Sequence, residues 1–304
     1  MKSIWKQPII VFFVAIFCCF LWGSAPPFIK LGYQFFSISS QDTASILLFA
    51  GLRFFLAGVF VLLYVALFHK RHERIQVKTL FPIGVLALCQ TVGQYYFYYI
   101  GLAHTTGVNG AIITGLGAFI SLLVACLIFR YEKLTGWKCF GCLCGFVGIV
   151  WMNQQGMQST QSFAWLGEGF VLLSQVCAAL SAGFIKYFSK KHDPVYLSGC
   201  QFLLGGFILM IIAYSSRGRL SFHSLDAVLN IAYLALVSAL AYTLWGILLS
   251  HNTMSKIGIF NCLIPIVGVL LSGIFLHETQ QVLQWNTFIS LAFISLGIYC
   301  VMKE

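Results

Sequence analysis

Charged residues are scarce in this sequence. Asp, Glu, Lys and Arg make up 9% of the 304 residues, whereas hydrophobic residues make up 60%. Soluble globular domains carry about 25% charged residues, because their surfaces face water. The composition therefore excludes an ordinary soluble domain and indicates a protein that lies in a membrane.

Motifs of several functional classes are also missing. The sequence has no glycine-rich nucleotide-binding loop, metal-ligand motif or nucleophile triad, which argues against an ATP-driven pump, a hydrolase and a bound cofactor or metal. It has no RNA- or DNA-binding motif either. Cys139, Cys142 and Cys144 lie close together without a nearby histidine, so we interpret them as small hydrophobic residues. We expect no enzymatic activity.

What the sequence does contain is a series of about ten apolar stretches. About 20 helical residues cross the ~30 Å hydrocarbon core of a bilayer, and helices satisfy their own backbone hydrogen bonds there. We predict an all-α integral membrane protein with ten transmembrane helices. The predicted spans are Pro8–Ile29, Ala44–Phe68, Leu80–Leu102, Gly107–Phe129, Trp137–Asn153, Trp165–Tyr187, Tyr196–Tyr214, Ala227–Leu249, Ile257–Leu276 and Val282–Val301.

The basic residues are unevenly distributed around these spans. Fourteen of the 18 Lys and Arg residues fall on the side that carries both termini, and only Lys30, Arg217 and Arg219 fall on the other. The positive-inside rule then predicts a multi-pass protein of the cell (plasma or inner) membrane with both termini in the cytoplasm. The net charge of +10 follows from this topology, with lipid headgroups as counter-charges, so we expect no nucleic-acid partner. The first span is too long for a secretion signal.

The second half of the sequence resembles the first. Gly51, Arg53 and Gly58 align with Gly199, Gln201 and Gly206 at a shift of 148 residues, and similar shifts relate other segments in the same order. We predict two repeats, residues 1–153 and 154–304. Five spans per repeat is an odd number, so the two copies must have opposite orientations, as in secondary transporters whose site lies between the halves near the midplane.

At four places the sequence resembles the EamA-type transporters of the drug/metabolite transporter superfamily. These places are Trp22-Gly23-Ser24 with Lys30, Arg53 to Ala57, Leu127 to Leu134 followed by a span with Gly141 and Gly148, and Ile264-Pro265 with Leu276-His277-Glu278. The resemblance implies two inverted five-helix repeats and, usually, export of small metabolites such as amino acids. The usual proline of the first repeat is Phe119 here, which puts a kink in the fourth span in doubt, although Gly115 and Gly117 could supply flexibility.

The first span is a candidate gate. Pro26 and Pro27 each remove a backbone donor, so this span should bend or unwind in its outer third, unless the helix simply ends at Ala25. Gly183 falls at the position of Pro27 in the sixth span, and interruptions at matching positions mark moving helices in transporters. The candidate gate and hinge residues are Gly23, Pro26, Pro27, Gly183 and Pro265.

A candidate cavity wall lies on the third span. Gln90, Gln94 and Tyr98 are spaced at i, i+4 and i+8, which places them on one helical face, and polar side chains in lipid must be paired or face water. Interhelical hydrogen bonding is the alternative role, and for the Trp and Tyr residues the membrane interface is another. The further candidates are Trp22, Asn109, Gln175, Tyr242, Trp245 and Asn261.

Four charged residues lie in or at the ends of the spans. Arg53 and Glu168 are placed near outer ends, where snorkelling to the interface is easy. We interpret Arg53 as structural, and Glu168 as either structural or a carrier of coupled protons. Glu132 and Glu278 end spans four and nine, where a carboxylate is unfavourable against the helix dipole, so we expect a structural contact to offset this.

These patterns favour a secondary transporter that exports small neutral or zwitterionic metabolites, such as amino acids, by alternating access. The cavity candidates do not ionise near neutral pH, so we expect selection by hydrogen bonding and aromatic packing. The alternatives are a channel or structural membrane protein without coupled transport and, less favoured, a membrane enzyme. The Gly141 to Gly145 pattern predicts close packing of the fifth span, within a monomer or in a homodimer.

Overall fold

The computed structural model describes residues 4–68, 77–131, 133–153, 164–222, 224–252 and 259–302. In the first half the helices are α1 (Pro8–Phe35), α2 (Thr43–Phe68), α3 (Val77–Leu86), η2 (Ala87–Gly93), α4 (Gln94–Ala103), α5 (Gly107–Gly115), α6 (Gly117–Leu123), η3 (Val124–Ile128) and α7 (Gly136–Asn153). In the second half they are η5 (Trp165–Gly169), α8 (Phe170–Phe188), α9 (Pro194–Ser215), α10 (Leu225–His251), η6 (Ile259–Cys262), α12 (Leu263–Phe275), α13 (Thr279–Val282) and α14 (Trp285–Met302). A short 3-10 turn, η1 (Ile4–Lys6), precedes α1.

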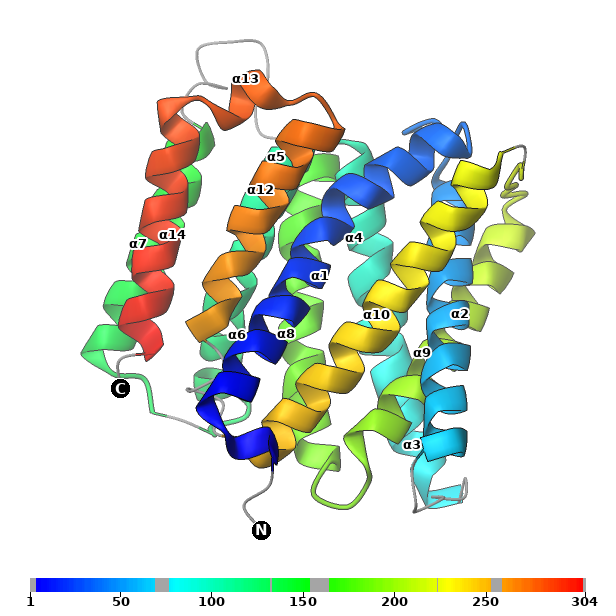
Figure 1. Cartoon of the computed structure of the whole chain (residues 1–304), viewed down its shortest axis with the longest axis horizontal. Helices are drawn as coiled ribbons and strands as arrows, with labels where there is room; N and C mark the ends of the chain where they lie inside the picture. Colours follow the sequence, from blue (N-terminus) through cyan, green and yellow to red (C-terminus); the bar gives the residue numbers. More distant parts are fainter. Residues whose placement is uncertain are drawn as a thin grey trace.

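These elements form ten crossings of one helical bundle, as the sequence predicts (Figure 1). The third crossing is α3, η2 and α4 in series, and the fourth is α5, α6 and η3. Within the described residues, six continuous helical segments are each long and apolar enough to cross a membrane. Large apolar side chains such as Phe13, Leu67 and Phe81 point outward and are more than half exposed, as expected for a surface that faces lipid rather than water.

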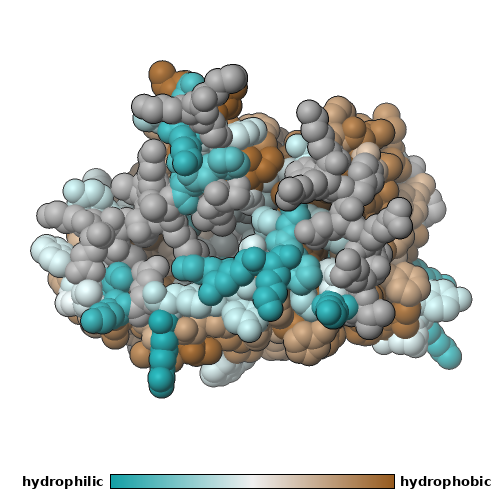
Figure 2. Space-filling model, turned by 90° about the horizontal axis from the view of Figure 1, so that it is seen from below, coloured by the Kyte–Doolittle hydropathy of each residue, from teal (hydrophilic) through white to brown (hydrophobic). Residues whose placement is uncertain are grey.

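The two ends of the helical bundle are formed by different parts of the chain. The described chain begins and ends at the lower end in Figure 1, and the α1–α2 connection and α13 lie at the upper end. Viewed from below, hydrophilic side chains lie between areas of hydrophobic surface (Figure 2). An even number of crossings places both termini on one side of the membrane.

The two halves meet most closely where α2 crosses α9. A Cβ atom added at Gly51 would lie 2.8 Å from Cγ of Met210, and one added at Gly199 would lie 2.9 Å from Cδ2 of Leu62. Gly199 and Met210 are the residues 148 positions after Gly51 and Leu62, so the two contacts are copies of each other. The contacts therefore show the duplication in three dimensions.

A second pair of copied contacts locates the pseudo-two-fold axis. A Cβ at Gly58 would meet the backbone of Leu203, and one at Gly206 would meet the backbone of Phe55. All four contacts are symmetric about a point between residues 56 and 57 of α2 and between 204 and 205 of α9. The axis that relates two inverted repeats lies in the plane of the membrane, at its middle. The distance of a residue from this point along its helix therefore indicates the depth of that residue in the membrane.

The fifth and tenth crossings also pack against each other, as repeat mates. A Cβ at Gly297 in α14 would lie 2.6 Å from the carbonyl oxygen of Gly141 in α7. The small residues of the fifth span thus permit close approach to a helix of the same chain. The ring of Phe119 fills the space beside Gly145 and Gly297.

The structure differs at the two places where the sequence suggests an interrupted helix, Pro26-Pro27 in the first span and Gly115 to Gly117 in the fourth. Helix α1 continues through Pro26 and Pro27 to Phe35, so it neither ends at Ala25 nor unwinds, although its ribbon turns toward α2 near its end (Figure 1). The fourth crossing has no proline, yet it is interrupted at Leu116 between Gly115 and Gly117. The break is slight, since Leu116 keeps right-handed helical backbone angles (φ −67°, ψ −17°), and it falls between the two glycines.

Candidate functional site

A cluster of one arginine and several aromatic residues occupies the centre of the bundle. It combines residues from α1 and α2 of the first half, from α4, and from α10 of the second half. We call it the central cluster, and it consists of Arg53, Tyr95, Tyr98, Tyr99, Tyr242, Trp22 and Trp245.

Arg53 is the charged group of the central cluster. Its side chain is only 3% exposed. Nε donates to the carbonyl oxygen of Leu234 at 3.0 Å, Nη1 to the hydroxyl of Tyr99 at 2.8 Å and Nη2 to the hydroxyl of Ser238 at 2.9 Å. The guanidinium also lies over the ring of Phe54, 4.9 Å from its centroid. Arg53 therefore links α2 to both α4 and α10.

The depth of Arg53 corrects the interpretation that it snorkels to the interface. Arg53 lies between three and four residues from the pseudo-two-fold axis, which is about 5 Å along the helix. Its three hydrogen-bond partners all belong to the protein interior. The predicted span Ala44–Phe68 already has residue 56 at its middle, so the placement of Arg53 near an outer end was wrong, and the contacts between the halves give the same central depth.

Aromatic side chains join the arginine to the other half of the cluster. The hydroxyls of Tyr95 and Tyr242 are 3.0 Å apart. The ring of Trp22 packs edge-on against Tyr242 and Trp245, with centroids 5.6 and 5.0 Å away. Trp22, Tyr242 and Trp245 are half-buried, so part of each remains available for contact.

The third crossing does not keep the simple helical face predicted for Gln90, Gln94 and Tyr98. Residues Ala87 to Gly93 form a π-helical stretch, which changes the rotation per residue and is frequent at functional sites. Gln90 is 2% exposed and its Oε1 has no hydrogen-bond partner among the described residues, whereas Gln94 is half-buried at the start of α4. Only Tyr98 lies among the tyrosines of the central cluster, 6.3 Å from Tyr95.

Three other predicted cavity residues lie elsewhere. Asn109 is at the start of α5, at the upper end of the bundle. Gln175 is buried in α8, where its Nε2 donates to Ser174 and its Oε1 lies against Gly117 of α6. Asn261 is in η6, which precedes α12, and its buried Oδ1 has no hydrogen-bond partner within the part of the chain that the structure describes. The structure does not bring these three residues to Tyr242.

A network of polar contacts joins the two halves at the upper end. The carboxylate of Glu168 accepts hydrogen bonds from the Thr105 hydroxyl at 2.6 Å, from Asn109 Nδ2 at 3.3 Å and from the backbone N–H of Ala164 at 2.9 Å. Asn109 in turn accepts from Gln281 Nε2 at 2.8 Å. We call these residues the upper network. Glu168 is 7% exposed and, like Arg53, does not snorkel.

Glu278 belongs to the same end of the bundle and has the structural contact that the sequence led us to expect. Its two carboxylate oxygens accept from the backbone N–H groups of Gly107 and Val108 at 3.0 and 2.9 Å. The carboxylate thus caps the N-terminus of α5, where the helix dipole favours a negative charge. Glu132, the corresponding residue of the first repeat, lies outside the described residues.

Two of the candidate gate residues lie close together. A Cβ at Gly23 would lie 2.8 Å from the carbonyl oxygen of Ile264, and one at Gly115 would lie 3.1 Å from Cγ of Pro265. Gly23 and Pro265 therefore mark the place where α1, α12 and α5 meet. Gly183 lies apart from them, under the ring of Phe129 in an uninterrupted α8.

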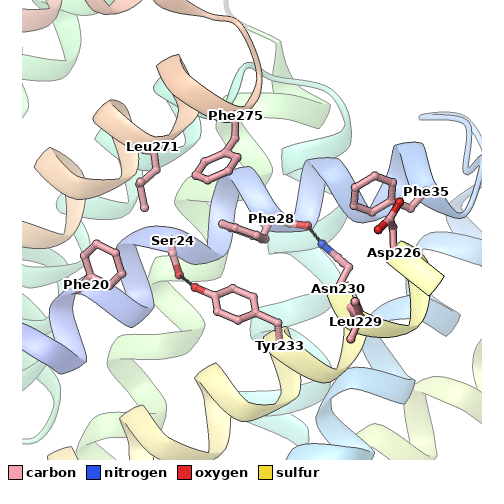
Figure 3. Close-up of a pocket in the computed structure, with 10 residues that line it drawn as sticks. All are labelled: Phe20, Ser24, Phe28, Phe35, Asp226, Leu229, Asn230, Tyr233, Leu271 and Phe275. Carbon is pink, nitrogen blue, oxygen red and sulfur yellow. Dashed lines mark hydrogen bonds between the residues drawn. The ribbon is translucent and has the colours of Figure 1, made fainter. Parts of the chain in front are cut away.

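A groove of about 490 Å³ runs along the outer side of α1, between α10 and α12 (Figure 3). Most of its lining is aromatic or aliphatic, including Phe28 and Phe275. Its polar lining includes the hydroxyls of Ser24 and Tyr233, which are 2.7 Å apart, and Asn230, whose Nδ2 donates to the carbonyl oxygen of Phe28 at 2.9 Å. These polar contacts hold α1 against α10.

Sequence reasoning missed several residues of the central cluster. Tyr95 and Tyr99 are not among the candidates from the sequence, and the structural role predicted for Arg53 gave no indication of its place beside the tyrosines. The available signal was the density of tyrosine from Tyr95 to Tyr99. The link from Arg53 to Ser238 joins residues 185 positions apart, and no local pattern indicates it.

Comparisons with known proteins agree with this architecture. The EamA-like transporter family model matches residues 9–154 and again 165–303. An uncharacterized transporter of Archaeoglobus fulgidus is 26% identical over 93% of this chain and 95% of its own length, and one of Synechocystis is 27% identical over 94% and 87%. A solved crystal structure matches 97% of this chain and 98% of its own chain with a TM-score of 0.66 at 16% identity, which shows the shared fold. With both halves matched, the chain belongs to the EamA-like transporter family and is a membrane transporter.

Proposed function

We propose that this membrane transporter exports small neutral or zwitterionic metabolites, such as amino acids, by alternating access. The observation that carries the proposal is the pseudo-two-fold relation between the halves, with the central cluster beside the axis. Two similar halves can pack in two related ways of similar energy, each open to one side. A channel or a structural membrane protein does not need this arrangement.

The chemistry of the central cluster supports a solute with an apolar or aromatic portion. Trp22, Tyr242 and Trp245 offer ring surfaces together with donor groups. Gln94, a half-buried amide, precedes Tyr98 by four residues in the same helix. Aromatic residues combine a large apolar area with a polar tip. Such a site favours small solutes that pair hydrogen bonding with apolar packing.

We also propose that the upper network is the outer gate. Its contacts connect Thr105 and Asn109 of the first half with Glu168 and Gln281 of the second. A path to the upper side requires the halves to separate there. Pro26 and Pro27 lie in α1 beneath this end and leave two carbonyl groups without helical donors, which suits a helix that bends during the exchange.

The first prediction concerns the orientation of the chain. The lower end carries most of the described Lys and Arg residues, so we expect it to face the cytoplasm, and we expect the Arg217–Arg219 turn to face outward. A cysteine placed at Arg217 should react with a membrane-impermeant thiol reagent in intact cells, whereas one at Lys190 should react only after the cells are opened. The reverse labelling pattern would refute this orientation.

The second prediction tests the solute site. Tyr242→Phe should weaken the apparent affinity for the transported solute by ~1–3 kcal/mol, because a polar group of the solute loses its partner. The matched control is Tyr214→Phe, since Tyr214 is exposed at the end of α9. Uptake and counterflow in proteoliposomes measure both variants. Saturation and counterflow identify a carrier, and their absence would indicate the channel alternative. Unchanged affinity in Tyr242→Phe would move the site elsewhere.

The third prediction tests the gate. Replacing Pro26 and Pro27 together with alanine restores two helical donors and should stiffen α1 by up to ~3 kcal/mol per proline. We expect slower transport at equal amounts of folded protein. Pro8→Ala is the control, because Pro8 is at the first turn of α1, where proline costs nothing. Equal flux in all three proteins would mean that α1 does not bend during transport.

The fourth prediction concerns coupling. We propose Glu168 as the proton carrier, because a proton on its carboxylate would remove an acceptor from the upper network and weaken the contact between the halves. A pH gradient across proteoliposomes should accelerate wild-type flux, and Glu168→Gln should lose this acceleration while retaining counterflow. An equal response to the gradient in both proteins would exclude Glu168 as the proton carrier.

A further inference from the structure

The charge of Arg53 has no opposite charge among its hydrogen-bond partners. Leu234 contributes a backbone carbonyl, and Tyr99 and Ser238 contribute hydroxyls. The ring of Tyr99 also faces the guanidinium, with its centroid 5.9 Å from Cζ of Arg53, and tyrosine is neutral near pH 7. Among the described residues, the hydrogen-bond partners that hold this positive charge about 5 Å from the midplane are therefore all neutral.

The guanidinium also keeps unused hydrogen-bonding capacity. Arginine has five N–H donors, and the structure shows three hydrogen bonds from Arg53, one from each nitrogen atom. Among the described residues, each of the two terminal nitrogens therefore has one N–H without a hydrogen-bond partner. A buried cation in a membrane protein is expensive and marks a functional pathway by default.

The equivalent position of the second half is not charged. Gln201 lies 148 residues after Arg53, is fully buried, and its Oε1 accepts a hydrogen bond from the Thr91 hydroxyl at 2.5 Å. This contact joins α9 to the third crossing in the same way that Arg53 joins α2 to the eighth. An uncharged amide is thus sufficient for the interhelical contact, and the positive charge of Arg53 needs another explanation.

We propose that Arg53 binds the carboxylate of the transported solute. This inference rests on the proposed function, narrows its zwitterionic solutes to amino acids bound through their carboxylate, and adds monocarboxylate anions to the class. The planar fork of arginine matches a carboxylate and forms charge-assisted hydrogen bonds with it. A single negative charge neutralises the site.

The neighbouring aromatic residues complete the recognition. Tyr95 stacks on Phe54 with ring centroids 3.9 Å apart, and its hydroxyl contacts Tyr242, beside Trp22. A solute held by its carboxylate at Arg53 would direct its side chain toward these rings. Because Arg53 is 3% exposed in this conformation, the solute reaches it when the Tyr95–Tyr242 contact opens.

The test compares ligands that differ only in the carboxylate. The probes are L-phenylalanine with L-phenylalaninamide and isovalerate with isovaleramide, measured by the shift in unfolding temperature of the protein in detergent. We expect the carboxylate of at least one pair to bind ~10–100-fold more tightly than its amide, the range of a hydrogen bond to a charged group. Equal affinities within both pairs, or no binding of either carboxylate, would overturn the proposal.

Variants then assign the preference to Arg53. Arg53→Gln should bring the carboxylate and the amide to within about 3-fold of each other, and Arg53→Lys should retain part of the preference because it keeps the charge but loses the fork. The matched control is Gln201→Met, which should keep the full preference. Retention of the preference in Arg53→Gln would overturn the proposal. If Arg53→Gln does not fold, Arg53→Lys decides, and an unaltered preference there would count against the bidentate site.

The measurement in detergent separates this site from the transport function. Binding needs no compartment, so a carboxylate preference without flux in proteoliposomes would support the site and refute the carrier. Flux of both members of a pair without preference would support the carrier and refute the site.

Discussion

The contact between α2 and α9 determines how the two halves meet. Helices in lipid gain little from apolar contact with each other, because lipid tails are equally apolar, and close packing through small residues replaces that driving force. Gly51, Gly58, Gly199 and Gly206 supply this packing in two symmetric pairs of contacts. Because this crossing lies on the pseudo-two-fold axis, the remaining helices of the two halves are arranged around it as symmetric copies. Polar residues near the crossing therefore lie near the middle of the membrane.

The same geometry separates two polar regions with different roles. Arg53 and the tyrosines lie near the axis, where water is excluded and each polar group must find a partner in the protein or in a solute. The upper network lies at one end, where Glu168 connects residues of both halves. In the proposed alternating access, the region near the axis would hold the solute and the contact at the upper end would separate to release it.

Much of this fold can be predicted from the sequence. Length and hydropathy indicate ten spans, and the Gly51/Gly199 alignment indicates the duplication that the helix contacts display. The charge at Glu278 is correctly expected to have a structural partner, although its partners at Gly107 and Val108 are about 170 positions away in the sequence. The exact boundary between the repeats at residues 153 and 154 stays a prediction, since residues 154–163 lie outside the described part of the chain.

The site is less predictable, for two physical reasons. Helical periodicity assumes a constant rotation per residue, and the π-helical stretch from Ala87 to Gly93 breaks that assumption between Gln90 and Tyr98. The contacts of a buried residue are set by how the helices pack, so the middle of the predicted span Ala44–Phe68 indicates the depth of Arg53 but not its hydrogen-bond partners. The partners of Arg53 come from two other helices, and only tertiary structure shows them together.

Separation of the halves at the upper end is the central claim, and a reversible cross-link tests it most directly. Asn109 and Gln281 belong to different halves and are 2.8 Å apart at their amides, so cysteines at both positions should join through a short thiol-reactive linker. The control pair is Gln281 and Thr287, which are in contact within one half. The account predicts that linking 109 to 281 stops transport until the linker is cleaved, whereas linking 281 to 287 does not. Full transport with the 109–281 link intact would contradict it.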